Sequence, residues 1–529
     1  MRLFMIHINN MDFRFPGLTD NLFSNLNLII DTNIRTGLIG RNGRGKSTLL
    51  SLIAGDIKPL SGNISSSVQV SIFRYQIDKF DCDVMRLVKN LAGNFAISEK
   101  LMEELLSNNR MEEYYKLQTE FSESGGYEMD YRIRKEFAAI KLDDNLLERT
   151  FDTLSSGQKI RAMITAMFLK KDAYPLIDEP ANHLDMDGMD ILGEYLNTKK
   201  GFLLVSHDRH LLDTSVENII SINKSDIKQT KGNYTTWFRD HTNQLEHEKR
   251  VDENIRREVV NLRIAEGKRK KWADDKEKEI NGSKLGKGFI SRRAAKLQKR
   301  ALSITDRINK KIEEKEELLQ NKEHEIGLAI MQNIRKTDNP ILRVDNLAAV
   351  RGDKELFSNL SFDIYPGEKV GINGPNGCGK STLFQILRGE FKANDGTISI
   401  LPEVTIRSIT DIFNDKSKIV SEILIDVKID RRVFTGILDG FGTDRNVMDN
   451  KLSLCSAGEL QKIYLAWTMY GESDLILWDE PLNYLDIASR EKLEDLLLNS
   501  KCSILFIEHD RRFIENVSDR VIELNNYLN

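Results

Sequence analysis

The feature that most constrains the fold is an internal repeat. The stretch LFSNLNLIIDTNIRTGLIGRNGRGKSTLL, which begins at Leu22, aligns without a gap with LFSNLSFDIYPGEKVGINGPNGCGKSTLF, which begins 334 positions later at Leu356. A similarity of this length predicts two copies of one domain. The chain has room for both, because it has 529 residues and a single hydrophobic core rarely serves more than about 300.

Each copy contains a phosphate-binding loop. An apolar strand, RTGLIG or KVGING, is followed by the pattern G-x-x-x-x-G-K-S and then by a helix start. The glycines let backbone N–H groups approach phosphate oxygens, the helix adds its positive end, the lysine reaches the β- and γ-phosphates, and the serine hydroxyl suits Mg²⁺. We therefore expect ATP at Gly40, Asn42, Gly43, Gly45, Lys46, Ser47 and Thr48, and at Gly374, Asn376, Gly377, Gly379, Lys380, Ser381 and Thr382.

Two further motifs recur with equal spacing. LSSGQ and CSAGE each precede an apolar strand that ends in Asp-Glu, and the serine lies 23 positions before the aspartate in both copies. We expect Asp178 and Asp479 to face the metal ion, and Glu179 and Glu480 to orient the attacking water. A histidine follows another apolar strand in each copy. Its recurrence, as His207 and His509, favours a γ-phosphate contact over a purely structural role.

Together these motifs resemble those of the ATP-binding cassette (ABC) ATPases, including the D-loops ANHLD and LNYLD. The resemblance implies an α/β fold with two P-loop NTPase nucleotide-binding domains that close head to tail within one monomer and hydrolyse ATP with Mg²⁺. One nucleotide would then lie between Lys46 and the second signature at Ser456 and Gly458, and the other between Lys380 and the first signature at Ser155 and Gly157. The implied metal ligands are Ser47, Gln76, Asp178, Ser381 and Asp479.

The two copies are not identical. The first has Gln76 at the Q-loop, where the second has Thr410, and Phe15 is placed to stack on adenine where the second reads AAVRGDK. We therefore predict that the two sites differ in nucleotide affinity or turnover.

Domain boundaries follow from the repeat. We expect cassettes at 1–235 and 339–529, with a linker at 236–338. In the linker, apolar residues recur every three or four positions from Leu297 to Ile312, a helical stripe, and the glycines of INGSKLGKG permit a reversal, so the pattern predicts a long α-helical hairpin. The first cassette also has 33 extra residues at about 95–130. They are helix-prone, and both a surface insertion and a partner-binding arm remain open.

Charge distinguishes the tip of this hairpin. Arg263 to Arg300 contains 14 basic and 5 acidic residues, a net charge of +9, whereas the whole chain carries −4. The expected tip, at about 281–300, has seven basic residues and no acidic one, which favours a structured RNA over an ordinary solvated helix face. The residues expected to bind RNA are Lys284, Lys287, Phe289, Arg292, Arg293, Lys296, Lys299 and Arg300.

A double cassette with a long basic hairpin, and without a run of about 18 apolar residues, resembles the ABC-F translation factors. The resemblance implies a cytoplasmic ATPase that binds the ribosome, contacts large-subunit rRNA and P-site tRNA from the E site, and binds neither membrane nor DNA. GLIGRNGRGKSTLL and LWDEPLNYLD are similar to the resistance branch of Vga, Lsa, Sal and OptrA type. A housekeeping ABC-F factor and the ATPase subunit of a transporter are alternatives.

Overall fold

The computed structural model describes residues 5–17, 20–74, 80–182, 184–223, 227–244, 335–352, 354–408, 415–443, 445–470 and 473–527, with residue 330 and scattered residues between 246 and 268. The chain divides into two compact units, Met1–Thr235 with Ile326–Asn529, and Thr236–Glu325. The first unit holds both copies of the repeat. In the second, the described residues are helical, and the expected hairpin tip with its RNA-binding residues lies outside them.

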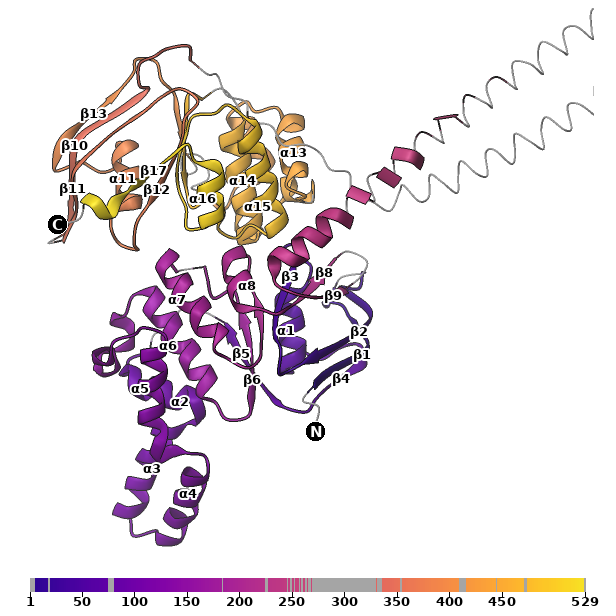
Figure 1. Cartoon of the computed structure of the whole chain (residues 1–529), viewed down its shortest axis with the longest axis vertical. Helices are drawn as coiled ribbons and strands as arrows, with labels where there is room; N and C mark the ends of the chain where they lie inside the picture. Colours follow the sequence, from indigo (N-terminus) through magenta and orange to yellow (C-terminus); the bar gives the residue numbers. More distant parts are fainter. Residues whose placement is uncertain are drawn as a thin grey trace, which may run out of the picture. The chain divides into compact units, whose positions relative to one another are not determined.

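The first copy is built on a six-stranded sheet of order β5-β6-β7-β3-β8-β9, parallel except for β9 (Figure 1). Its central strands are apolar and almost fully buried, as expected of strands covered on both faces. The strands are β3 (Arg35–Gly40), β5 (Gln69–Arg74), β6 (Ala173–Asp178), β7 (Phe202–Val205), β8 (Asn218–Ile222) and β9 (Ile227–Lys231).

The second copy repeats this topology in a parallel sheet of order β14-β15-β16-β12-β17. Each of these strands has a counterpart at the same place in the first sheet, so the sequence repeat is also a repeat of topology. The strands are β12 (Lys369–Asn373), β14 (Ile406–Ser408), β15 (Leu475–Asp479), β16 (Ile504–Ile507) and β17 (Arg520–Glu523).

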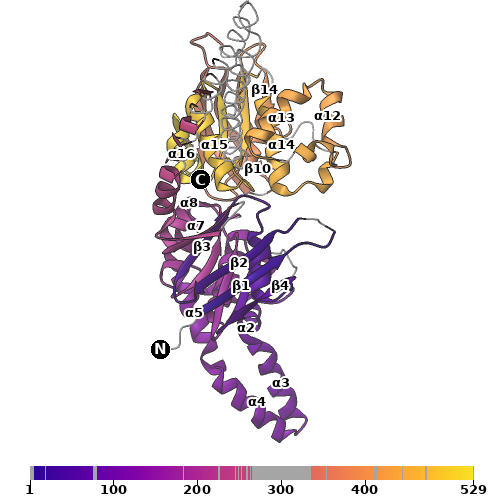
Figure 2. The same cartoon turned by 90° about the vertical axis from the view of Figure 1, so that its right-hand side faces the viewer.

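A three-stranded antiparallel sheet accompanies each parallel sheet, with the order β2-β1-β4 in the first copy (Figure 2) and β11-β10-β13 in the second (Figure 1). In β2, buried Leu26, Leu28 and Ile30 alternate with exposed residues and join β1 and the parallel sheet in one core. The strands are β1 (Met5–Phe13), β2 (Phe23–Asp31), β4 (Ser61–Ser66), β10 (Leu342–Arg351), β11 (Lys354–Ile364) and β13 (Asp395–Ile400).

The helices of the first copy are α1 (Lys46–Ala54), α2 (Val84–Gly93), α3 (Phe95–Ser107), α4 (Met111–Glu123), α5 (Met129–Ala139), α6 (Ser156–Leu169), α7 (Met186–Asn197) and α8 (Arg209–Ser215). Those of the second are α11 (Lys380–Leu387), α12 (Val420–Asp426), α13 (Arg431–Gly440), α14 (Ala457–Met469), α15 (Ile487–Asn499) and α16 (Arg511–Val517). Among the helices that the structure describes, none is long and apolar enough to cross a membrane.

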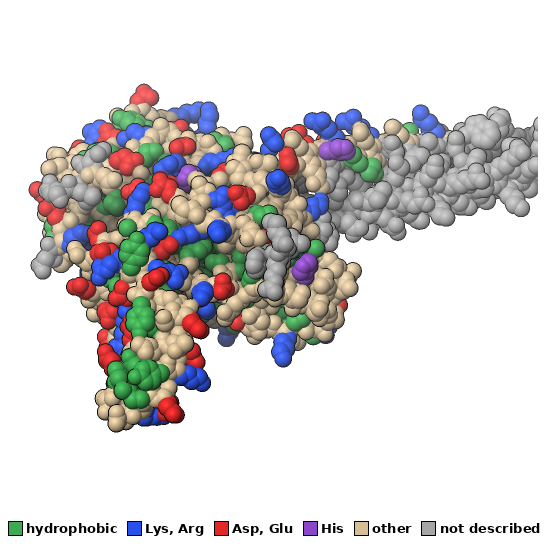
Figure 3. Space-filling model, turned by 60° about the horizontal axis from the view of Figure 1, so that its bottom comes forward, with side chains coloured by type: hydrophobic (Ala, Val, Ile, Leu, Met, Phe, Trp, Pro, Cys, Tyr) green, Lys and Arg blue, Asp and Glu red, His purple; other side chains and the backbone are tan. Residues whose placement is uncertain are grey.

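Helices α3 and α4 occupy the segment at about 95–130. They pair with each other and project beyond α2 and α5 in both views (Figures 1 and 2). Hydrophobic side chains gather on this projection, including the exposed Ile97, Leu101, Met111 and Tyr115 (Figure 3). The structure thus places a helical pair here, and its role stays open.

Candidate nucleotide-binding sites

Both phosphate-binding loops use glycines in the left-handed region of the backbone. Gly45 has φ of 88° and Gly379 has φ of 106°, and an added Cβ at Gly45 would lie 2.8 Å from side-chain atoms of Leu22 and Phe23. These glycines are also the N-caps of α1 and α11. Among the described residues, no side chain caps either helix, so its first N–H groups stay open to an anion.

The loop lysines are buried and fold back over their own loops. Lys46 Nζ donates a hydrogen bond to Gly40 O at 2.7 Å, and Lys380 Nζ donates to Gly374 O at 2.6 Å and Pro375 O at 3.1 Å. Burial lowers the pKa of both lysines. A cation beside open N–H groups is suited to a polyphosphate.

The structure places the expected metal ligands of the second copy together. Asp479 ends β15 and interacts with the Ser381 hydroxyl. Burial raises the pKa of Asp479, and this effect is larger than the opposite effect of the Ser381 hydroxyl. The Oδ1 atom of Asp479 is buried and has no hydrogen-bond partner among the described residues, which fits an oxygen that faces a cation. Asp178 ends β6 in the corresponding position. These residues therefore suit Mg²⁺.

Each expected catalytic glutamate lies beside its expected histidine. Glu179 and Glu480 follow the aspartates with left-handed φ values of 47° and 50°, and their N–H groups bond to the ends of β7 and β16. His207 Nε2 lies 3.3 Å from Glu179 Oε1, and His509 Nε2 lies 3.6 Å from Glu480 Oε1. The neighbouring strand thus brings the histidine to the glutamate in both copies.

The two glutamates differ in their environments. Burial raises the pKa of Glu179 to about 7, against the opposing charge of Lys46, and burial lowers the pKa of His207 well below its ordinary value. The pKa of Glu480 is instead lowered, first by His509 and also by the amide of Asn483. At neutral pH the second glutamate is therefore the more fully ionised.

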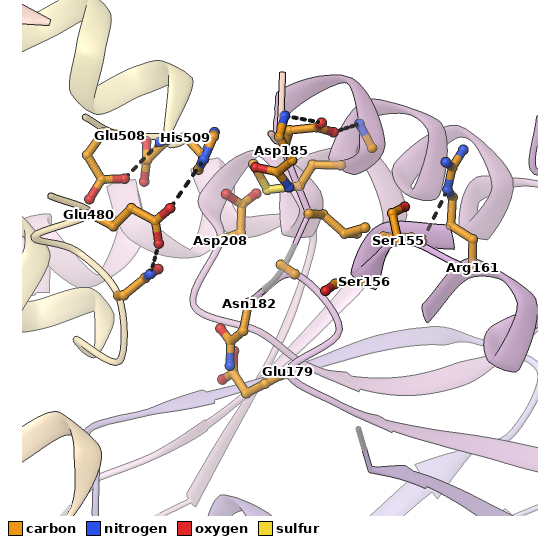
Figure 4. A pocket seen from close by; sticks show the side chains of 18 of the residues that line it. Ser155, Ser156, Arg161, Glu179, Asn182, Asp185, Asp208, Glu480, Glu508 and His509 are labelled. Atoms are coloured by element: carbon orange, nitrogen blue, oxygen red, sulfur yellow. Dashed lines mark hydrogen bonds and ion pairs between the residues drawn. The ribbon is translucent and has the colours of Figure 1, made fainter. Parts of the chain in front are cut away.

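The signature serines begin helices. Ser155 is the N-cap of α6 and Ser456 is the N-cap of α14, and each forms a capping box with the residue three positions later. A Cβ at Gly458 would lie 2.8 Å from Asn42 Nδ2, so the second signature abuts the first loop. The opposite signature shares a cavity of about 580 Å³ with the second loop (Figure 4). Its lining includes Ser155, Gly157, Asn376, Gly377, Glu480 and His509.

Two aspartates that sequence reasoning missed join the cassettes. Asp486 Oδ2 accepts a hydrogen bond from Asn42 N at 3.0 Å, and Asp185 Oδ2 accepts one from Asn376 N at 3.1 Å. Each stands at the end of a D-loop and reaches the phosphate-binding loop of the other copy. The available signal was the identical spacing of seven positions from Asp178 to Asp185 and from Asp479 to Asp486.

A buried group of four charged residues also joins the copies on one side, and we call Arg209, Arg490, Glu494 and Asp510 the interface ion cluster. Arg209 lies 2.7 Å from Glu494 and 3.2 Å from Asp510, and Arg490 lies 3.6 Å from Asp510. The residue corresponding to Arg209 is Arg511, which makes a more exposed pair with Asp190 at 2.9 Å. The interface is therefore asymmetric.

Two expected site residues remain untested by this geometry. Phe15 is exposed and packs edge-to-face on Phe13, with ring centroids 5.1 Å apart, and its stacking on adenine stays a prediction. Gln76 lies outside the described residues, as does Thr410 at the corresponding place in the second copy.

A family model described as "ABC transporter" matches residues 23–182 and 357–483, more than half of the chain. The chain belongs to the ABC transporter family. As an ABC protein with two cassettes, it is an ATPase.

Two relatives of this ABC protein match it along most of its length. It is 27% identical over 536 residues to the ribosome protection protein VmlR of Bacillus subtilis (strain 168), covering 99% of this chain and 87% of VmlR. It is 26% identical over 537 residues to the energy-dependent translational throttle protein EttA of Escherichia coli (strain K12), covering 95% of this chain and 89% of EttA.

A solved structure of the archaeal ribosome recycling factor aABCE1, in complex with the ribosomal stalk protein aP1, aligns with a TM-score of 0.61 and 19% identity. The alignment covers 97% of this chain and 87% of that one. At this identity the likeness shows the fold: tandem α/β cassettes of the same architecture.

Proposed function

We propose that this ATPase binds the ribosome, with segment 236–338 at the E site pointing toward P-site tRNA and the peptidyl transferase centre. There it gives resistance to lincosamide, streptogramin A and pleuromutilin antibiotics by target protection. One observation carries the proposal: two copies of the nucleotide-binding motifs are joined by a segment with a net charge of +9 over Arg263 to Arg300 in a chain of −4. The similarity to VmlR over 99% of the chain supports it.

The site residues have separate parts in hydrolysis. Lys46 and Lys380 offset the charge that develops on the phosphates, and Glu179 and Glu480 each orient a water for in-line attack. Ser47, Asp178, Ser381 and Asp479 would hold Mg²⁺, which neutralises phosphate charge when bound. Each signature serine and its helix N-terminus contribute donors from the opposite copy. ATP then holds the two copies closed, and hydrolysis lets them separate and release the ribosome.

The proposal is tested by stopping hydrolysis. In the Glu179→Gln/Glu480→Gln double variant, ATP binds but the two water-orienting carboxylates are lost, so the protein should be trapped on ribosomes. Co-sedimentation with purified ribosomes should be strong with ATP and weak with ADP. A double variant that binds ATP yet fails to sediment with ribosomes at low salt would contradict ribosome binding.

The RNA contact has its own test. Reversing the charges of Arg292, Arg293, Lys296, Lys299 and Arg300 should weaken sedimentation and leave ATP binding unchanged. Wild-type binding should fall by orders of magnitude between about 50 and 200 mM salt, with a shallower slope in this variant. Reversal of Lys310, Lys311 and Lys315, in the mixed-charge part of the same segment, is the control, and its effect per reversed charge should be smaller.

A second function has comparable support. The translational throttle protein EttA is 26% identical to this chain, so a housekeeping translation factor is the alternative. Expression in a susceptible host distinguishes the two, with inhibitory concentrations measured over ribosome-targeting drugs. A rise for the three drug classes supports target protection, and no shift for any drug favours the housekeeping role. The other alternative, the ATPase subunit of a transporter, would require a separate membrane partner.

A further inference from the structure

The two oxygens of the Glu480 carboxylate have different surroundings. Oε2 accepts a hydrogen bond from the side-chain amide of Asn483, whereas Oε1 lies 3.6 Å from His509 Nε2 (Figure 4). Glu480, Asn483 and His509 all line the cavity that also contains Ser155 and Asn376. One oxygen is therefore anchored within the loop, and the other remains on the side of the histidine.

The backbone fixes the donor in this place. Asn483 N donates to Glu480 O at 3.2 Å, which closes a tight turn directly after β15, and the N–H of the intervening Leu482 donates to Glu508 Oε1 at 2.6 Å. Glu480 itself is held in the left-handed region at φ 50°. The amide and the carboxylate thus belong to one constrained turn.

We propose that Asn483 is a positioning residue for ATP hydrolysis at the second glutamate: it anchors Oε2 and so leaves Oε1 available to orient the attacking water. The terminal torsion of a glutamate has a broad energy minimum, so an unanchored carboxylate would rotate. A neutral amide donor fixes that torsion without adding charge.

The first copy supplies a natural comparison. Asn182 stands 301 positions before Asn483, at the same place in the repeat, and lies beside Glu179 in Figure 4. Its side chain makes no hydrogen bond to any residue that the structure describes. Glu179 Oε2 instead accepts from the backbone N–H of His207 at 3.3 Å. The proposed role therefore belongs to Asn483 and not to Asn182.

The test compares Asn483→Ala with Asn182→Ala in the full chain. Hydrolysis is followed as single turnovers of bound ATP, so that unequal sites contribute separate phases. For Asn483→Ala we expect one phase to slow by roughly tenfold, because a donor to a charged group is lost. ATP affinity and the melting temperature should stay near the wild-type values. Asn182→Ala should slow hydrolysis less than Asn483→Ala does.

Two further variants show whether Asn483 acts through Glu480. In a Glu480→Gln background, Asn483→Ala should slow turnover no further, because the group it positions is already gone. Asn483→Gln keeps an amide and should recover part of the rate. An unchanged rate in Asn483→Ala, an equal effect of Asn182→Ala, or a full additional loss in the Glu480→Gln background would each overturn the proposal. None of these results depends on ribosome binding.

Discussion

Replacing Arg209 by methionine tests how strongly the interface ion cluster holds the two copies together. The Arg209 side chain is 3% exposed, and its partners Glu494 and Asp510 are 9% and 5% exposed. Removing one member of a buried ion pair typically costs about 3–5 kcal/mol, because the remaining charge is buried without its counter-charge. Arg490 still faces Asp510, and Asn516 still donates to Glu494, so we expect the lower end, about 3 kcal/mol.

The matched control is Arg511→Met. Arg511 follows the second His-Asp pair as Arg209 follows the first, but its side chain is 45% exposed and that of its partner Asp190 is 34% exposed. Water and salt screen such a pair, which contributes about 0–1 kcal/mol. The two substitutions remove the same side chain, so the difference between them measures burial at the interface.

Urea unfolding of the full chain, followed by circular dichroism, is the assay. A chain with two domains need not unfold in a single step, so the midpoint of the first cooperative transition is compared between the variants. A loss of about 3 kcal/mol should lower its midpoint by at least about 1 M at a typical urea dependence. Arg511→Met should move the midpoint by a small fraction of that. Equal shifts for the two variants would refute the argument that the buried cluster stabilises the paired copies.

Three other predictions concern the site residues. Burial raises the pKa of Glu179 from 4.5 to about 7, so the folded state loses stability as the pH rises through that range and the carboxyl group ionises. The Glu179→Gln variant has no such group, so its melting temperature should rise relative to that of the wild type between about pH 5 and about pH 8. Asp486→Ala should lower the melting temperature more than Asp185→Ala, because it also leaves the buried Lys462, 3.7 Å away, without its carboxylate. Gly45→Ala should weaken ATP binding and destabilise the fold by about 1–3 kcal/mol, more than Gly43→Ala, which meets no atom within 4 Å.

Much of the site was predictable because its chemistry restricts residue type and spacing. A phosphate loop requires glycines and a lysine in a fixed order, and an acidic pair must follow a buried strand, so one repeat was enough to locate Lys46, Glu179 and His207. The α/β architecture followed from the same motifs, and the family match agrees with it.

Other features depend on geometry that no local pattern carries. Arg209 and Glu494 are 285 positions apart and meet only because the copies pair. In the sequence alone they cannot be distinguished from charged residues on exposed helix faces. The bond between Asn483 and Glu480 depends on a left-handed backbone at Glu480, which is unusual for a residue with a side chain. Residues 269–329, which include the expected basic tip and the returning helix, lie outside the described residues, so the hairpin stays a prediction.

The asymmetry of the interface ion cluster bears on how a duplicated chain chooses its own partner. Consider two such chains that exchange halves, so that first pairs with first and second with second. In the repeat, Gly193 stands where Glu494 stands, and Met189 where Arg490 stands. A pair of first halves would therefore set the guanidinium of Arg209 against a glycine and leave it buried without that carboxylate, which is unfavourable. The cluster therefore disfavours the pairing of two first halves and favours a first half paired with a second half.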